Sequence, residues 1–276
     1  MGKRQAICIG LTTGLSLSGT TQLISCTGRN AWATKSSIMD FSQEELIDAV
    51  ERLVAGLIER AGVVEPPVDA LRIAEEHLGI PVSVAEPEED ERGRPRAGTR
   101  RTEGIVLSPH ATEEQRHFSA AQGIARALLP DLLRKFGLAA DNENKQAMAY
   151  IRGLLATRLL VPTKLLRSSL RSCKYDLPAL QKLFRTASLE TIAHRLLDLD
   201  DPCVIAIVDD GVVASRRGNA APMSKKLTPA EQACLTRVME QDLPDRQRFD
   251  GWTVQGWPVP NRPIRRVILR AVPDDV

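Results

Sequence analysis

The stretch RHFSAAQGIARALL contains the side chains whose types and spacing could do chemistry. Its small and apolar residues recur at helical spacing, and Gln122 and Arg126 stand one turn apart, so a helix would present both on one face. An amide beside a permanent cation could hold an anionic ligand or a peptide carboxylate. The alternative is that Arg126 extends into solvent or pairs with Asp141 or Glu143, and contributes only to packing. Gly123 lies between the two side chains, although glycine is a poor residue for the interior of a helix.

Capping signals locate the helices that would position these side chains. Ser42 and Glu45 form a capping box for a helix that should end near Gly62. Thr112, followed by Gln115, begins the helix that contains the opening stretch. Further helical periodicity covers 68–79, 141–160, 163–171, 177–185 and 188–199.

Strand signals lie before and after this helical block. Two short strands are predicted at 81–86 and 104–109, on either side of a charged segment. Later the chain shows a hairpin that turns at Asp210-Gly211, a helix capped by Thr228, and strands in GWTVQGWPV and IRRVILRAV. The order of elements predicts an α+β protein, with a mostly helical body that carries a small β-sheet.

The same patterns divide the chain into parts. We expect a helical domain at 39–200 and an α+β C-terminal region at 201–276. The charged segment 86–102 is predicted to be a solvated loop. Residues 1–38 are predicted to be a disordered or spuriously translated extension. Pro130 should kink or end the central helix.

The N-terminal extension leaves one alternative open. Lys3 and Arg4 precede a mildly apolar run that ends in the lipobox-like Leu23–Cys26, which could direct export as a lipoprotein. Many Ser and Thr residues dilute that run, and it is shorter than the roughly 20 apolar residues of a membrane span. We therefore expect no membrane span and a cytoplasmic protein, with Met39 as a candidate initiator.

The order of these segments resembles the ImmA/IrrE family of zinc-metallopeptidase-like proteins, over about 40–200. The family's central helix reads approximately RFTLAHELGHALLH, and a later helix reads ExxANxFAAxLLxP. Phe118, Ser119 and Ala121 fall on counterparts in the first helix, while Leu159 and Pro162 fix the second. The resemblance implies a zincin-like body and a role beside a DNA-binding regulator, in stress response or mobile-element control. It also implies a zinc ion as cofactor.

Zinc chemistry in this family requires two histidines four residues apart, a glutamate beside the first, and a carboxylate from the later helix. The positions that match this motif hold Gln122, Gly123, Arg126 and Ala149. A neutral amide is a weak ligand, a guanidinium has no lone pair to donate, and alanine donates nothing. The sequence therefore predicts a vestigial site, with neither a zinc ion nor a catalytic residue.

Two observations bear on a zinc site with ligands elsewhere. Glu143 would reach the third-ligand position only if the register slipped. The four histidines form no pair at helical ligand spacing and are expected at the surface or at helix caps; they are His77, His110, His117 and His194. His110 and His117 could still meet at the start of the central helix. No phosphate loop, nucleophile elbow or dinucleotide fingerprint is evident.

Composition limits the remaining classes of function. Lysine plus arginine number 37 against 35 acidic residues, so no strong global field favours nucleic acid. Five scattered cysteines include no CxxC pair, and Cys203 and Cys234 are expected to be buried. Two basic clusters are expected to be solvated faces, with nucleic-acid contact as the alternative; they comprise Arg167, Arg171, Lys174, Arg216, Arg217, Lys225 and Lys226.

The sequence thus predicts a catalytically inactive protein of this family that acts as a regulatory or protein-binding module. Its partner is expected to be another protein, such as a separate DNA-binding regulator, because no helix-turn-helix is evident. One alternative is an active zinc metallo-endopeptidase that cleaves a regulator through ligands in another register. Another is a nucleic-acid-binding regulator that uses the basic clusters, although direct binding is not expected.

Overall fold

The computed structural model describes residues 42–85, 104–138, 144–221 and 223–274. Several predictions concern residues outside these ranges and are not addressed by the structure; they are the N-terminal extension 1–38 with its lipobox, Met39, the charged loop 86–102, Asp141 and Glu143.

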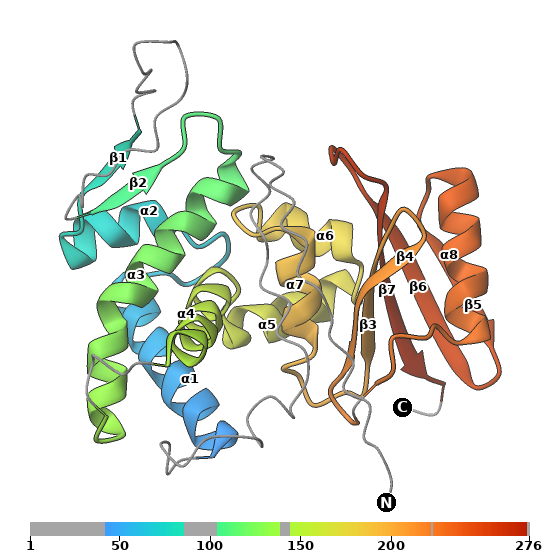
Figure 1. The fold of residues 1–276 in the computed structure, drawn as a ribbon, viewed down its shortest axis with the longest axis horizontal. Helices are drawn as coiled ribbons and strands as arrows, with labels where there is room; N and C mark the ends of the chain where they lie inside the picture. The colour runs from blue at the N-terminus through green and yellow to red at the C-terminus, as the bar shows by residue number, and fades with distance from the viewer. Residues whose placement is uncertain (1–41, 86–103, 139–143, 222, 275–276) are drawn as a thin grey trace, which may run out of the picture.

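Helices build the first part of the described chain (Figure 1). Ser42 and Thr112 both form complete capping boxes, with Glu45 and Gln115 respectively, as the sequence predicts. The helices are α1 (Gln43–Arg60), α2 (Ala70–Arg72) with the π-helical turn η2 (Ile73–His77), α3 (Glu113–Lys135), α4 (Lys145–Leu160), α5 (Thr163–Cys173), α6 (Leu177–Leu183) and α7 (Leu189–Leu196).

Pro130 lies inside α3, and the helix continues beyond it to Lys135. Of the two expected effects of this proline, termination of the helix does not occur. A proline removes the hydrogen bond to the carbonyl four residues earlier, which belongs to Arg126. Both residues are exposed, so water can satisfy that carbonyl and the helix can continue.

A two-stranded parallel sheet lies against the helical body. Strand β1 (Val82–Val84) pairs with β2 (Ile105–Leu107), with Val82 opposite Ile105. The side chains of Ile105 and Leu107 are buried, whereas Val106 between them is exposed, as the alternation of a strand requires. This small sheet therefore presents one apolar face to α3, which packs against β2.

The C-terminal region forms a five-stranded antiparallel sheet. The strand order is β4 (Val212–Gly218), β3 (Val204–Asp209), β7 (Arg266–Pro273), β6 (Trp252–Val259) and β5 (Asp245–Phe249), and α8 (Pro229–Gln241) connects β4 to β5. The predicted hairpin is confirmed, because Asp210 and Gly211 both have positive φ, at 47° and 82°.

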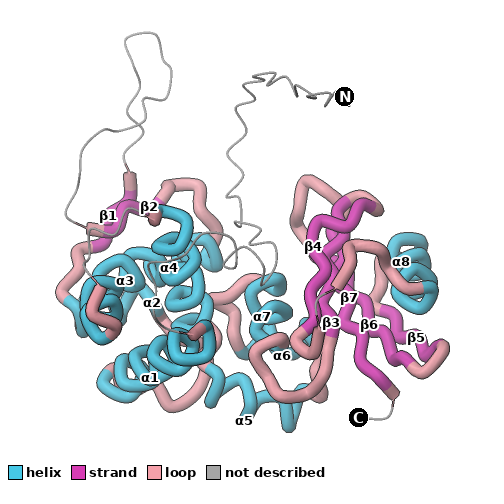
Figure 2. Tube along the Cα trace, turned by 60° about the horizontal axis from the view of Figure 1, so that its bottom comes forward, coloured by secondary structure: helices cyan, strands magenta, loops and turns pink. Residues whose placement is uncertain are grey.

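This sheet has an apolar face on each side. Ile205, Ile207 and Ile268 join the core of the helical body, while Val204 and Leu269 pack under α8. Figure 2 shows the resulting layers, with the helical body on one face of the sheet and α8 on the other. The overall class is therefore α+β, as the sequence predicts.

Candidate functional site

The predicted site lies on α3, which packs against both α4 and β2. Alanines at 120, 121 and 125 are fully buried and let the neighbouring elements approach the helix closely. Gln122 and Gly123 are half-buried, and Arg126 is exposed. The three residues are thus at the edge of the helix interface rather than inside it.

Gly123 allows β2 to approach the backbone of α3. A Cβ atom built on this glycine would lie 2.3 Å from Cγ1 and 2.6 Å from Cδ1 of Ile105. Such distances are far inside van der Waals contact, so any side chain at position 123 requires Ile105 or the strand to move. The space that a glutamate side chain would enter is occupied by isoleucine.

Arg126 extends from α3 into solvent. Among the described residues it forms no ion pair and no hydrogen bond, and its expected partners lie outside those residues. Ala149 is half-buried on α4 and offers only a methyl group. The structure therefore places the four predicted positions on two packed helices, but brings no metal-binding side chain from them together.

A zinc ion does not fit the side chains at these positions. Imidazole, thiolate and carboxylate groups are the ligands that zinc uses in proteins. Within the part of the chain that the structure describes, no group of three or more His, Cys, Asp or Glu residues is arranged to hold a metal ion. Gln122 contributes at most one weak amide oxygen, and Arg126 contributes no lone pair.

The histidines differ from the expectation in two cases. His77 and His110 are exposed, but His117 is buried with its Nδ1 atom 3.8 Å from Oδ1 of Asp69. Burial also lowers the pKa of His194 to about 4, with a further contribution from the nearby positive charge of Arg217. His117 thus belongs to the interior and His194 is half-buried, and burial lowers the pKa of both imidazoles because it disfavours the charged form.

A buried network of charges, which the sequence patterns did not reveal, joins α1, α4 and α7. The guanidinium groups of Arg158 and Arg195 are 1% and 2% exposed. Arg158 Nε lies 2.9 Å from Glu51 Oε1, and its Nη2 atom lies 3.1 Å from Asp198 Oδ1. Arg195 also pairs with Asp198, and its Nε donates to the Val161 carbonyl at 3.0 Å. Each buried cation therefore faces two carboxylates, as burial demands.

A second network attaches α7 to the large sheet. The carboxylate of Glu190 is 1% exposed and lies 2.7 Å from Nη2 of Arg262 and 2.9 Å from Nη1 of Arg266. Burial acts to raise the pKa of Glu190, but the hydrogen bond from Arg266, aided by Arg262, lowers it overall. Arg266 also forms two hydrogen bonds to Asp209, at 2.6 and 2.7 Å. These pairs fix the helical body against the sheet.

The basic clusters are partly neutralised. Arg216 lies 3.0 Å from Glu231 with both side chains buried, and Arg167 lies 2.8 Å from Asp200 at the surface. Cys203 and Cys234 are buried as predicted, and burial raises the pKa of both thiols, that of Cys234 to about 12. Neither thiol is therefore a nucleophile near neutral pH.

A comparison with known protein families matches part of the chain. Residues 75–197 match the family described as IrrE N-terminal-like domain, among the M78 peptidases. The match identifies residues 75–197, rather than the whole chain, as an IrrE N-terminal-like domain. The match includes α3, α4 and the segments that lead to α7, so it covers all four predicted site positions.

A solved structure extends the likeness to most of the chain. It is described as a Mycobacterium tuberculosis transcriptional regulator, with a TM-score of 0.62 and 17% identity, and the match covers 83% of this chain and 80% of that chain. At this identity the match establishes a shared fold. A comparison with curated proteins found no match. In the described residues, no helix is long and apolar enough to cross a membrane.

Proposed function

We propose that this protein is a catalytically inactive member of the ImmA/IrrE family that acts as a regulatory or protein-binding module. The observation that carries the proposal is the contact between Gly123 and Ile105. A general base at that position would need a side chain, and a Cβ atom there would lie 2.3 Å from the isoleucine. Glycine at position 123 is thus consistent with the packing around it, because Ile105 of β2 fills the volume that a glutamate side chain would need.

The expected effects on rate and on zinc binding support the loss of catalysis. Removal of a positioned general base typically lowers a rate by about 10² to 10⁴. Replacement of both imidazoles by an amide and a guanidinium further leaves the metal without adequate ligands, since Gln122 and Arg126 supply at most one weak oxygen. The two effects act on the same reaction, so peptidase activity should be lost.

The proposed role is regulation through a protein partner. The description of the structural neighbour as a transcriptional regulator supports a role in control of gene expression. The family resemblance further suggests a separate DNA-binding regulator as the partner, in the cytoplasm, in stress response or mobile-element control. Residues 39–200 would form the metallopeptidase-like domain, and 201–276 an α+β region that is joined to it by the Glu190 ion pairs.

The experiment that tests this proposal identifies a partner and asks whether it is cleaved. The tagged protein is cross-linked in its own cells, and a candidate partner is then purified separately and mixed with the protein. We expect a complex of fixed stoichiometry in which the partner keeps its full-length mass, both with and without the zinc chelator 1,10-phenanthroline.

Two outcomes would replace the proposal with its alternatives. Cleavage of the partner that stops in the presence of the chelator would establish a working zinc peptidase with ligands in another register. Salt-dependent gel retardation of nucleic acid by the protein alone, which falls when Lys225 and Lys226 are changed to alanine, would instead establish direct nucleic-acid binding.

A further inference from the structure

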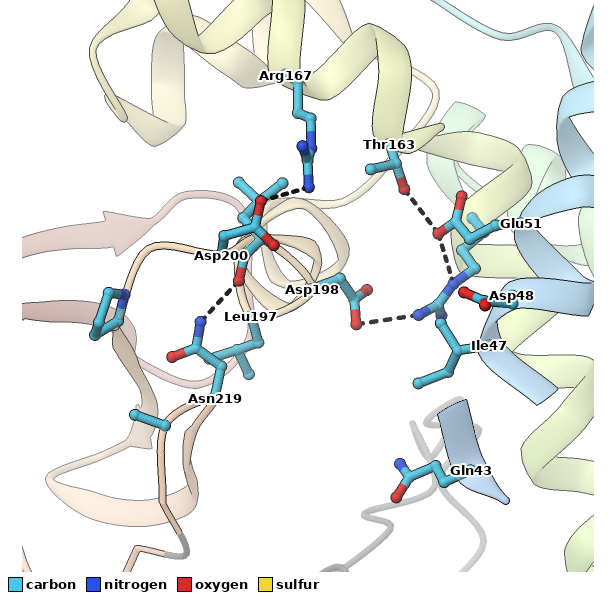
Figure 3. A pocket seen from close by; sticks show the side chains of 14 residues that line it. Gln43, Ile47, Asp48, Glu51, Thr163, Arg167, Leu197, Asp198, Asp200 and Asn219 are labelled. Atoms are coloured by element: carbon cyan, nitrogen blue, oxygen red, sulfur yellow. Dashed lines mark hydrogen bonds and ion pairs between the residues drawn. The ribbon is translucent and has the colours of Figure 1, made fainter. Parts of the chain in front are cut away.

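A pocket of about 620 Å³ lies between the helical body and the C-terminal sheet (Figure 3). One wall comes from α1, which contributes Gln43, Ile47 and Glu51 on successive turns of the same face, with Asp48 beside them. The opposite wall comes from the segment that follows α7 and from the end of β4. The volume is in the range of small-molecule sites, roughly 300 to 1,000 Å³. This pocket includes none of the residues of the predicted metal site.

Arg158 also lines the pocket, and its guanidinium is held between Glu51 and Asp198. Glu51 Oε1 accepts hydrogen bonds from Arg158 Nε at 2.9 Å and from Thr163 Oγ1 at 2.7 Å, and it also lies 3.4 Å from Arg195 Nη2. All of these contacts use one oxygen. Glu51 Oε2 has no partner among the described residues, so it remains as an acceptor.

The balance of charge around the pocket is acidic. Four carboxylates and two guanidinium groups line it, and Arg195 behind them pairs with Glu51 and Asp198, which leaves a formal excess of one negative charge. Arg167 is paired with Asp200 at 2.8 Å, so it is not available to an anion. Asp48 is exposed and has no ion-pair partner in the described parts of the chain. The unpaired charge is therefore negative and lies on α1.

The rest of the lining favours an organic molecule over a bare metal ion. Ile47, Leu197, Leu199 and Pro202 provide apolar surface beside the carboxylates. The described residues contain no arrangement of three His, Cys, Asp or Glu groups that could hold a metal ion. A ligand with a short hydrocarbon body would cover the apolar surface, and its cationic group would meet the carboxylates.

We propose that this pocket binds a small organic cation, an amine or guanidine with a short hydrocarbon body. The cationic group interacts with Asp48 and Glu51 Oε2, and the hydrocarbon body covers the apolar surface of Ile47 and Leu197. Such a ligand touches both α1 and the end of β4, so its binding stabilises the junction between the helical body and the sheet. The inference stands on the pocket alone and does not depend on the loss of peptidase activity.

The test measures binding to the full chain by isothermal titration calorimetry at low ionic strength. The probes are L-argininamide and agmatine, which each have two cationic groups, and succinate as an anion of similar length. We expect saturable binding of both cations and none of succinate. Absence of saturable binding for both cations, or tighter binding of succinate, would overturn the proposal.

Two variants place the binding in this pocket. Asp48→Asn removes an exposed charge without disturbing the buried network, and should weaken argininamide binding by about tenfold or more. Glu44→Gln removes a charge from the same helix outside the pocket and should leave affinity unchanged within about twofold. Equal affinities for native protein and Asp48→Asn would overturn the proposal, because the cation would then bind elsewhere.

Discussion

Two regions of this molecule differ in how their arginine side chains are buried and paired. On α3, Arg126 stands at the surface, where no described residue pairs with it. At the junction of α1, α4 and α7, Arg158 and Arg195 are fully buried and each faces two carboxylates. The first region holds the positions that we match to the catalytic motif of the family, and the second lies among three helices of the helical body.

In our proposal, the difference separates a residue that a site once needed from residues that the fold needs now. A side chain without partners can change with little effect on the folded state, whereas removal of one partner from a buried network leaves an uncompensated charge. Arg126 is therefore free to vary. The buried arginines at the junction of the three helices are not, and this contrast can be measured.

Replacement of Arg195 by methionine should give the largest loss of stability. The substitution preserves much of the side-chain volume but removes the cation that faces Asp198 and Glu51, which are 29% and 30% exposed. We expect the free energy of unfolding to fall by about 3 kcal/mol, at the lower end for a broken buried pair because water reaches both carboxylates. Urea denaturation of the native protein and the variant measures this loss.

The matched control for this change is Arg167→Met, which breaks an exposed pair with Asp200. That pair is 54% and 85% exposed, so its loss should cost at most about 1 kcal/mol. Equal losses for the two variants would contradict the contrast between buried and surface charges.

The second prediction concerns pH and His194. Burial lowers its pKa in the folded protein to about 4, from 6.5, so the unfolded chain takes up the proton first as pH falls. The contribution of neutral His194 to the free energy of unfolding is therefore fully present above pH 6.5. It is lost progressively as the pH falls towards about 4, by up to about 3 kcal/mol. His194→Gln should flatten this part of the stability profile, whereas His110→Gln at the surface should not.

The third prediction compares two glycines in helices. Gly123→Ala should destabilise the protein by about 1 to 2 kcal/mol, because the new Cβ atom meets Ile105 at 2.3 Å. Gly153→Ala on α4 meets no atom within 4 Å and should stabilise it by about 0.5 to 1 kcal/mol. Thermal unfolding of both variants shows whether each change raises or lowers stability. A gain in stability for Gly123→Ala would show that β2 leaves room for a side chain.

The smallest effect is expected for Arg126→Ala. The side chain is exposed and unpaired among the described residues, so stability should change by no more than about 0.5 kcal/mol. Phosphate and citrate should shift the melting temperature of the variant and of the native protein equally. A shift confined to the native protein would indicate that Arg126 and Gln122 hold an anion.

Local signals in the sequence were sufficient for most elements of the fold. The capping residues Ser42, Thr112 and Thr228 begin their helices as predicted. Strand β5 was missed, because DRQRF is a charged edge strand without apolar alternation. Asp250-Gly251 after it was the available signal, since both residues adopt the positive φ of a tight hairpin turn.

The sites were predictable to different degrees. The spacing around Gln122 and Arg126 could be matched to a motif because all of its first part lies on one helix. The contact of Gly123 with Ile105, and the meeting of Glu51 with Arg158 and Arg195, depend on tertiary packing between segments far apart in the chain. An arginine within an apolar run such as LLATRLL was the one available sign that a charge would be buried.

The central claim is that the former catalytic site can no longer hold zinc, and metal analysis of the purified protein tests it most directly. The protein is produced in zinc-supplemented medium, dialysed exhaustively, and its zinc content is measured by mass spectrometry against protein concentration. We predict far less than one zinc ion per chain, with no change in Gln122→Ala. One tightly bound zinc per chain, lost when a single histidine or carboxylate is replaced, would contradict the account.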